Sequence, residues 1–267
     1  MAVEWVVAAG VLAGASAALW GLSAWMTRRI EATVPINGRF VEVDGERFHY
    51  VEEGKGPPLV MIHGLMGSSR NLTYALSGQL REHFRVISLD RPGSGYSTRH
   101  SGTPADLPAQ ARQIAAFINT LDLGKPLVLG HSLGGAIALA LALDHPHAVS
   151  GLVLVAPLTH PQRMLPLVFL SLAVRPAWLR RWVAHTLTLP IGLIYGAQDK
   201  VLDFQKHGQA LASKVPGLKM QVIEGRGHML PITATERVAA LVEKVAKRAR
   251  PGESVRPINP PVALASQ

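Results

Sequence analysis

One short stretch, residues 127–143, constrains the fold more than any other part of the chain. It begins with the apolar residues 127–129, which favour a β-strand, passes through Gly-His-Ser-Leu-Gly at 130–134, and continues into a run of Ala and Leu that favours an α-helix. A strand that turns into a helix over so few residues packs the two elements so closely that only glycine fits on either side of the turn. The pattern therefore predicts a strand, a very tight turn and a helix, with Ser132 at the centre of the turn.

The position of Ser132 in this turn is typical of a nucleophile. Such a turn holds its central residue in a strained backbone conformation and lifts the hydroxyl clear of the backbone, beside the first free N–H groups of the helix. A Gly-x-Ser-x-Gly string alone is a weak signal, because both residues are common, and an idle serine in a glycine-rich connection is the alternative. The flanking strand and helix are the context that favours the nucleophile.

Composition narrows the class of protein. The chain has 267 residues, enough for one large domain with a sizeable core, and no cysteine, which excludes disulfides, thiolate metal sites and a cysteine nucleophile. Its formal net charge of +9 is dispersed, with basic clusters only at 28–29, 180–181 and 244–250, and no aromatic residues are interleaved with them. We therefore expect no nucleic-acid partner; an anionic membrane surface is the better candidate, and a plain solvated face is the alternative.

The N-terminal segment, residues 1–30, is predicted to be a membrane anchor. It has no charged residue from Trp5 to Met26, a length that spans the hydrocarbon core as a helix with Trp5 and Trp25 at the two interfaces. The following pair Arg28-Arg29 places the C-terminal side in the cytoplasm by the positive-inside rule. The alternative is a cleaved signal that yields a secreted or periplasmic protein; small residues at 15–17 favour it, whereas the lack of a preceding Lys or Arg disfavours it.

Residues 31–250 alternate between strand and helix patterns, which predicts a mostly parallel sheet covered by helices on both faces. The first two strands flank Asp44-Gly45 and are expected to form an antiparallel hairpin. Residues 251–267 are expected to form a disordered tail. The predicted strands are 39–43, 47–51, 59–62, 84–89, 127–129, 149–155, 190–195 and 219–223, and the predicted helices are 69–81, 104–121, 136–143, 203–215 and 233–248.

A serine nucleophile needs a base beside it and a carboxylate that orients the base, both at the ends of later strands. Asp199 directly follows the strand at 190–195, and His228 lies in a glycine-flanked loop after the last strand. Asp203 is a nearby rival carboxylate, but its position is that of a helix N-cap. The predicted catalytic residues are therefore Ser132, Asp199 and His228.

Taken together, these motifs resemble the α/β-hydrolase superfamily over about residues 39–247. The resemblance rests on five matches in order: His63-Gly64, Asp-Arg-Pro-Gly-Ser-Gly-Tyr-Ser at 90–97, the turn at 130–134, Gly-Ala-Gln-Asp at 196–199, and Gly227-His228. It implies an α/β-hydrolase fold with an eight-stranded, mostly parallel sheet and no metal or organic cofactor.

The resemblance also implies a role for each matched residue. Ser132 is the nucleophile, His228 is the general base and then the acid, and Asp199 orients the imidazole. The oxyanion hole is expected from the backbone N–H of Leu133 and that of Leu65, with Met66 as second choice for the latter.

The presence of a serine at the nucleophile position limits the reactions that the protein is expected to catalyse. Members of the superfamily that open epoxides or displace halide use an aspartate at this position, whereas a serine points to acyl transfer to water. We therefore expect hydrolysis of carboxylic esters, either small molecules or lipid-like ones. Cofactor-free haloperoxidases and carbon–carbon bond hydrolases carry the same triad, and a non-catalytic ligand-binding protein is a further alternative.

Two other predictions concern residues around the site. His131 is expected to pack beneath the catalytic loop, and Asp90 to be a structural hydrogen-bond acceptor. The segment 158–189, where relatives insert a cap, has room for only two short helices. Its Trp178, Trp182 and Arg180-Arg181 either lie against the bilayer or simply cover the edge of the sheet.

Overall fold

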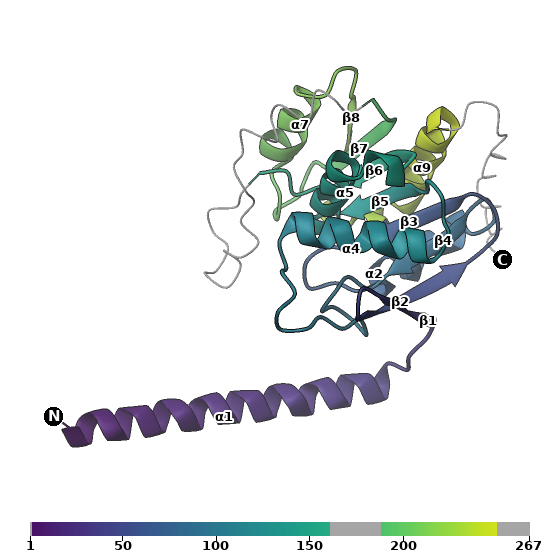
Figure 1. Ribbon diagram of the computed structural model, residues 1–267. Helices are drawn as coiled ribbons and strands as arrows, with labels where there is room; N and C mark the ends of the chain where they lie inside the picture. Colours follow the sequence, from purple (N-terminus) through teal and green to yellow (C-terminus); the bar gives the residue numbers. More distant parts are fainter. Residues whose placement is uncertain (1, 161–187, 250–267) are drawn as a thin grey trace, which may run out of the picture. The chain divides into compact units, whose positions relative to one another are not determined.

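The computed structural model of the chain describes residues 2–160 and 188–249 (Figure 1). The chain divides into two compact units, Met1–Asn37 and Gly38–Gln267. Most of the predicted cap at 158–189, including Trp178, Trp182 and Arg180-Arg181, lies outside the described residues, as does the predicted tail at 251–267.

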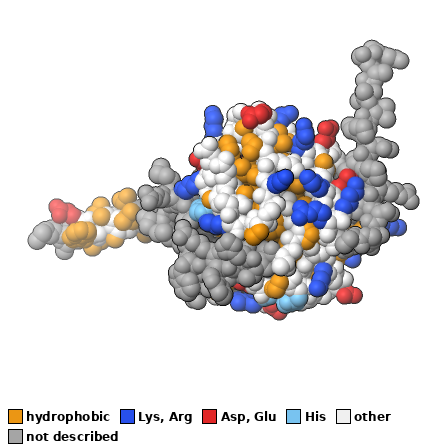
Figure 2. Space-filling model, turned by 90° about the horizontal axis from the view of Figure 1, so that it is seen from above, with side chains coloured by type: hydrophobic (Ala, Val, Ile, Leu, Met, Phe, Trp, Pro, Cys, Tyr) orange, Lys and Arg blue, Asp and Glu red, His pale blue; other side chains and the backbone are white. Residues whose placement is uncertain are grey.

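The N-terminal unit is a single long helix, α1 (Ala2–Thr33). Its stretch Glu4–Arg29 has a mean hydropathy of 1.7 and contains no buried residue, and Figure 2 shows hydrophobic side chains along its visible part. A helix that is apolar on all sides is normally surrounded by protein or by lipid. By length and composition α1 can cross a membrane, a test that an N-terminal signal sequence passes as well.

The second unit is built on one eight-stranded sheet in the order β1-β2-β4-β3-β5-β6-β7-β8. The first two strands form the predicted hairpin, β2 also pairs antiparallel with β4, and every other pair is parallel. The predicted eight-stranded, mostly parallel sheet is therefore confirmed. The strands are β1 (Arg39–Val43), β2 (Glu46–Glu53), β3 (Pro58–Ile62), β4 (Arg85–Leu89), β5 (Leu127–His131), β6 (Gly151–Val155), β7 (Ile191–Gly196) and β8 (Met220–Ile223).

Helices cover both faces of the sheet (Figure 1). The helices α4 (Leu107–Thr120) and α5 (Leu133–Asp144), with the short η2 (Pro146–Ala148), pack on one face. The opposite face is covered by α2 (Arg70–Leu72), η1 (Thr73–Ser77), α3 (Gly78–Leu80), α8 (Leu230–Thr233) and α9 (Thr235–Ala249). Two further short helices, η5 (Gln205–Gln209) and α7 (Ala210–Ala212), follow β7.

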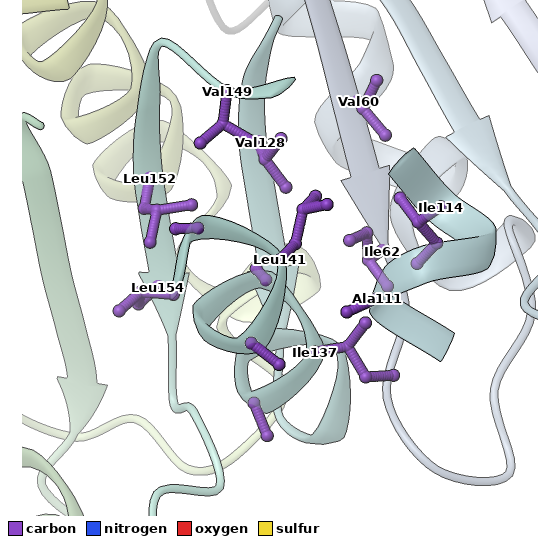
Figure 3. Close-up of a cluster of buried hydrophobic side chains, with 14 of the residues drawn as sticks. Val60, Ile62, Ala111, Ile114, Val128, Ile137, Leu141, Val149, Leu152 and Leu154 are labelled. Atoms are coloured by element: carbon purple, nitrogen blue, oxygen red, sulfur yellow. The ribbon is translucent and has the colours of Figure 1, made fainter. Parts of the chain in front are cut away.

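The buried strands divide their side chains between two cores. In β3, Val60 and Ile62 belong to the core beneath α4 and α5, whereas Leu59 and Met61 belong to the core beneath α9. Figure 3 shows the first core, where Ile137 and Leu141 of α5 lie near strand side chains. Because both faces are apolar, the central strands appear in the sequence as continuous apolar runs rather than as alternating ones.

The predicted helix at 69–81 forms in three pieces, with a π-helical turn (η1) in the middle. Leu72, Leu76 and Leu80 are all fully buried and recur every four residues. Four residues turn an ideal α-helix by about 40° more than one full circle, so leucines at this spacing drift off one face. The wider π turn offsets this drift.

The basic charge is spread over the surface of the second unit that Figure 2 presents. Lys and Arg side chains lie at many points of this face among apolar and uncharged ones, with few Asp and Glu between them. The expectation that no nucleic acid is bound stays a prediction.

Candidate active site

Ser132 lies at the tight turn between β5 and α5. Its backbone has φ 55° and ψ −118°, a strained conformation for a non-glycine residue. The helix begins at Leu133, directly after the serine and three residues earlier than the sequence predicted. The Ser132 hydroxyl caps no N–H of α5. It is therefore held in the strained turn without being used for local structure.

Close packing of α5 against β3 maintains this turn. A Cβ atom at Gly134 would lie 2.2 Å from the carbonyl oxygen of Ile62 and 2.6 Å from that of His63, both of them backbone atoms that cannot easily move. The glycine pattern predicted close packing of α5 on its own strand, which Gly130 confirms, since a Cβ there would lie 2.4 Å from the Gly134 carbonyl oxygen; the approach of α5 to β3 was not predicted.

Gly134→Ala is therefore expected to lower the free energy of unfolding by about 1–3 kcal/mol, because the backbone of α5 or β3 has to shift. Thermal unfolding of the full-length protein in detergent measures this. The control is Gly78→Ala, since a Cβ there meets nothing within 4 Å and helical alanine is favoured over glycine. Equal unfolding midpoints for the two variants would contradict the assigned packing.

The loops after β7 and β8 are tied to each other by their backbones. Ala197 donates to the carbonyl of Ile223 at 2.9 Å, and Gln198 donates to that of Arg226 at 2.9 Å. A Cβ atom at Gly196 would lie 2.3 Å from the Arg226 carbonyl oxygen, so the glycine allows this close contact. The two loops that carry Asp199 and His228 are therefore held side by side.

Asp199 and His228 form the hydrogen-bonded pair that the sequence predicted. Asp199 Oδ2 lies 2.7 Å from His228 Nδ1, and Asp199 Oδ1 accepts the N–H groups of Val201 at 2.8 Å and Leu202 at 2.9 Å. The Asp199 side chain is fully buried, whereas the His228 side chain is 13% exposed. Burial alone raises the pKa of Asp199, but the hydrogen bond from His228 and those from the two backbone N–H groups outweigh it and lower this pKa overall.

The rival carboxylate Asp203 has a different role. Its Oδ1 accepts the N–H of Gln205 at 2.8 Å and that of Lys206 at 3.4 Å, which caps the turn that follows. The prediction that Asp203 is a helix cap is therefore confirmed.

The turn at Ser132 and the loop at residues 224–229, which carries His228 and is called the base loop after its predicted role, meet at the same edge of the sheet, because β5, β7 and β8 are parallel strands that end there. The ring centroid of His131, the neighbour of Ser132, lies 4.9 Å from that of His228. The Nε2 atom of His228 is hydrogen-bonded to none of the described residues, Ser132 included. Catalytic hydrogen bonds are often long before a substrate binds, so the lack of this bond is compatible with proton transfer from Ser132 to His228 in a substrate complex.

The loop after β3 approaches the nucleophile from the other side. A Cβ atom at Gly64 would lie 3.0 Å from Ser132 Cβ, and the N–H of Gly67 closes a turn onto the Gly64 carbonyl at 3.4 Å. Within this turn Met66 has φ 55° and is 92% exposed. The N–H groups of Leu65 and Leu133 make no hydrogen bond to any described residue, so both are available to an oxyanion.

A buried arginine, whose role the sequence did not predict, holds this loop in place. Arg91 donates from Nε to the carbonyl of His63 at 3.1 Å, from Nη2 to that of Gly64 at 3.0 Å, and from Nη1 to Gln110 Oε1 at 2.8 Å. Burial lowers its pKa to about 10. Arg91 is part of the 90–97 motif, so the motif located it, but its partner on α4 depends on the fold.

His63 supports the same loop in its neutral form. Its Nδ1 donates to the Gly64 carbonyl at 2.8 Å and its Nε2 accepts the N–H of Arg91 at 3.0 Å. Burial, together with the positive charge of Arg91, lowers the pKa of His63 to about 3. His63 is therefore a structural residue of the loop rather than a second base.

Asp90 is the structural acceptor that the sequence predicted. Its carboxylate accepts the N–H of Ser69 at 2.6 Å and that of Tyr96 at 3.0 Å, and it lies 2.8 Å from His49 Nδ1.

Among the residues that the structure describes, no group of three or more His, Cys, Asp or Glu is arranged to hold a metal ion.

The sequence of the chain is similar to a known protein family and to curated relatives. The family model of the α/β-hydrolase fold matches residues 57–193. Haloalkane dehalogenase 2 of Mycobacterium tuberculosis is 36% identical over 123 residues, 45% of this chain and 42% of that protein. Pimeloyl-[acyl-carrier protein] methyl ester esterase of Aeromonas salmonicida is 37% identical over 116 residues, 43% of this chain and 42% of that protein. Each match thus spans less than half of the relative's length.

Solved structures extend the similarity to most of the chain. A thermophilic esterase from Thermogutta terrifontis matches with a TM-score of 0.70 and 21% identity, over 79% of this chain and 99% of that one. A bacterial membrane phospholipase A matches with a TM-score of 0.66 and 20% identity, over 92% of this chain and 99% of that one. The sheet order, the strained serine turn and the family match over residues 57–193 lead to one conclusion: this chain belongs to the α/β-hydrolase family.

Proposed function

We propose that the protein is a serine hydrolase that cleaves carboxylic esters through an acyl-enzyme intermediate. The observation that carries the proposal is the hydrogen-bonded pair of Asp199 and His228, 2.7 Å apart, at the same sheet edge as Ser132 in its strained turn. A serine hydroxyl is a weak nucleophile at neutral pH, and an oriented imidazole beside it is the arrangement that activates it.

Each group has a defined task in the proposed reaction. His228 Nε2 accepts the proton of Ser132 as the serine oxygen attacks the ester carbonyl carbon, and the N–H groups of Leu133 and Leu65 stabilise the resulting oxyanion. The imidazolium then gives its proton to the departing alcohol, and a water molecule activated by the same imidazole releases the acid. Asp199 keeps the proton on Nδ1, so that Nε2 is free to act as the base.

Halide displacement is the less favoured reaction, although a haloalkane dehalogenase is among the relatives. That reaction needs a carboxylate to attack an alkyl carbon and form an ester, whereas this chain has Ser132 at the nucleophile position. Carbon–carbon bond cleavage and cofactor-free haloperoxidase chemistry use the same triad, and the relatives include both esterases and 2-hydroxy-6-oxo-2,4-heptadienoate hydrolase. We take ester hydrolysis as the first candidate, because it is the acyl transfer to water that the serine favours. A panel of p-nitrophenyl esters, a vinylogous 1,5-diketone and monochlorodimedone separates the three activities.

The direct test of a working nucleophile is covalent labelling of the full-length protein in detergent with a fluorophosphonate probe. We expect rapid labelling, and mass spectrometry of the digest should place the adduct on Ser132, because only an activated serine beside an oxyanion hole reacts quickly. Absence of labelling would favour a ligand-binding protein without turnover.

We propose further that α1 anchors the protein in a membrane and that lipid-like esters are among its substrates. The uncharged length of α1 supports this, and so does the match to the membrane phospholipase A. The unit from Gly38 onward is less than nine-tenths of the chain, so a match over 92% has to include part of residues 1–37.

Alkaline carbonate extraction of native membranes tests the anchor. We expect the full-length protein to remain in the membrane pellet with its N-terminal residues intact by mass spectrometry. A soluble protein shortened at its N-terminus would show that the segment is a cleaved signal instead.

A further inference from the structure

The ring of His131 is bonded to the residue that carries the proposed base. His131 is the last residue of β5 and is 4% exposed. Its Nε2 lies 3.0 Å from the backbone carbonyl oxygen of His228. A carbonyl oxygen can only accept a hydrogen bond, so Nε2 carries the proton and donates it.

This bond links a rigid element to an exposed loop. Strand β5 is paired on both sides, with β3 and β6, and is buried along its whole length. The loop that precedes His228 is exposed at residues 224–226. On the other flank the loop is held by the bond from Gln198 to the Arg226 carbonyl and by the pair with Asp199. The bond from His131 therefore fastens the base loop to the strand that leads into Ser132.

The His131 ring is also neutral, which suits its position beside His228. Burial, together with the neighbouring His228, lowers the pKa of His131 to about 4. A neutral ring beside His228 adds no positive charge that would oppose the imidazolium forming there during the reaction.

We propose that His131 is a positioning residue, whose N–H bond to the His228 carbonyl fixes the base loop at the distance from Ser132 that proton transfer requires. The inference rests on the proposed hydrolase function and extends it to a residue outside the triad. His131 itself touches neither the substrate nor the reacting atoms in this scheme.

The test compares His131→Gln with His131→Asn in the full-length protein. The amide nitrogen of glutamine reaches roughly where Nε2 of histidine lies, whereas that of asparagine reaches only the position of Nδ1. We expect kcat for a p-nitrophenyl ester to fall about 10- to 100-fold in His131→Asn with KM changed less than about twofold, because a small misplacement of the base slows proton transfer. His131→Gln should stay within about threefold of the wild type.

The control removes a comparable bond elsewhere at the same edge. Tyr195 is fully buried and its hydroxyl donates to the carbonyl of Pro157 at 2.5 Å, a bond that involves no residue of the base loop. Tyr195→Phe should therefore reduce the thermal midpoint much as His131→Asn does, and leave kcat within about twofold.

A readout independent of activity completes the test. Amide hydrogen exchange at residues 224–229 should be faster in His131→Asn than in the wild type, His131→Gln and Tyr195→Phe. Equal kcat values for the asparagine and glutamine variants, or unchanged exchange in this loop, would overturn the inference. Fluorophosphonate labelling of the wild type tests the proposed hydrolase function separately, because this experiment uses neither His131 variant.

Discussion

Replacing Ser132 with alanine is expected to reduce turnover of a p-nitrophenyl ester by about 10⁴-fold or more, because the attacking oxygen is lost. The fold should be little affected, since the hydroxyl caps no helix N–H and alanine keeps the same Cβ in the strained turn. Steady-state kinetics and a thermal unfolding curve measured on one preparation check both parts. Residual activity above about a tenth of the wild-type value would mean that another group is the nucleophile.

The matched control for this variant is a buried serine with a structural role. The Ser97 hydroxyl donates to the Asp90 carbonyl at 2.8 Å and accepts the N–H of His49 at 2.8 Å. Ser97→Ala should therefore lower the free energy of unfolding by about 1–3 kcal/mol, because it leaves buried groups unsatisfied. Its turnover should be close to that of the wild type, the opposite pattern to Ser132→Ala.

Asp199→Asn should reduce kcat by a factor on the order of 10⁴, because the amide stabilises the wrong tautomer of the base. An asparagine can present its N–H to Nδ1 of His228, which moves the ring proton to Nε2, the atom that must accept the proton of Ser132. The measurement is kcat against pH, with Asp203→Asn as control. That variant keeps the helix cap, because asparagine caps a helix about as well as aspartate, and it should retain both its stability and its activity. Equal losses of kcat in the two variants would remove Asp199 from the triad.

The lowered pKa of Asp199 also determines how the stability of the folded protein depends on pH. Its folded-state pKa lies below the ordinary 3.8, so the ionised carboxylate contributes stability above that pH and this contribution is lost as the pH falls through the folded-state value. Protonation of Asp199 therefore does not limit the wild-type enzyme between about pH 5 and pH 8.

The sheet and the loops of the site could be predicted from the sequence because each has a local signal. Strands such as β3 and β5 are apolar on both faces and end in glycine-containing loops, so their order along the chain places Ser132, Asp199 and His228 at one edge. The sequence predicts the start of α5 three residues too late, because residues 133–135 include two glycines and have a lower helix propensity than the run of Ala and Leu that follows.

The contacts around the triad could not be predicted in this way, because they join residues far apart in the chain. Arg91 is bonded to Gln110 on α4, and His131 is bonded to the backbone of His228. The sequence predicts that His131 packs beneath the catalytic loop, but it does not identify the His228 carbonyl as the acceptor of its hydrogen bond. The π turn at Thr73–Ser77 likewise follows from packing three leucines onto the sheet rather than from helix propensity.

The backbone bonds between the loops after β7 and β8 have a consequence for how such enzymes diversify. Ala197 and Gln198 tie the acid to the segment that carries the base, so the two side chains shift together as one unit. The chain between β6 and β7 enters upstream of this unit. Insertions or deletions there can change the length of the chain over generations while the hydrogen-bonded pair of Asp199 and His228 keeps its internal geometry.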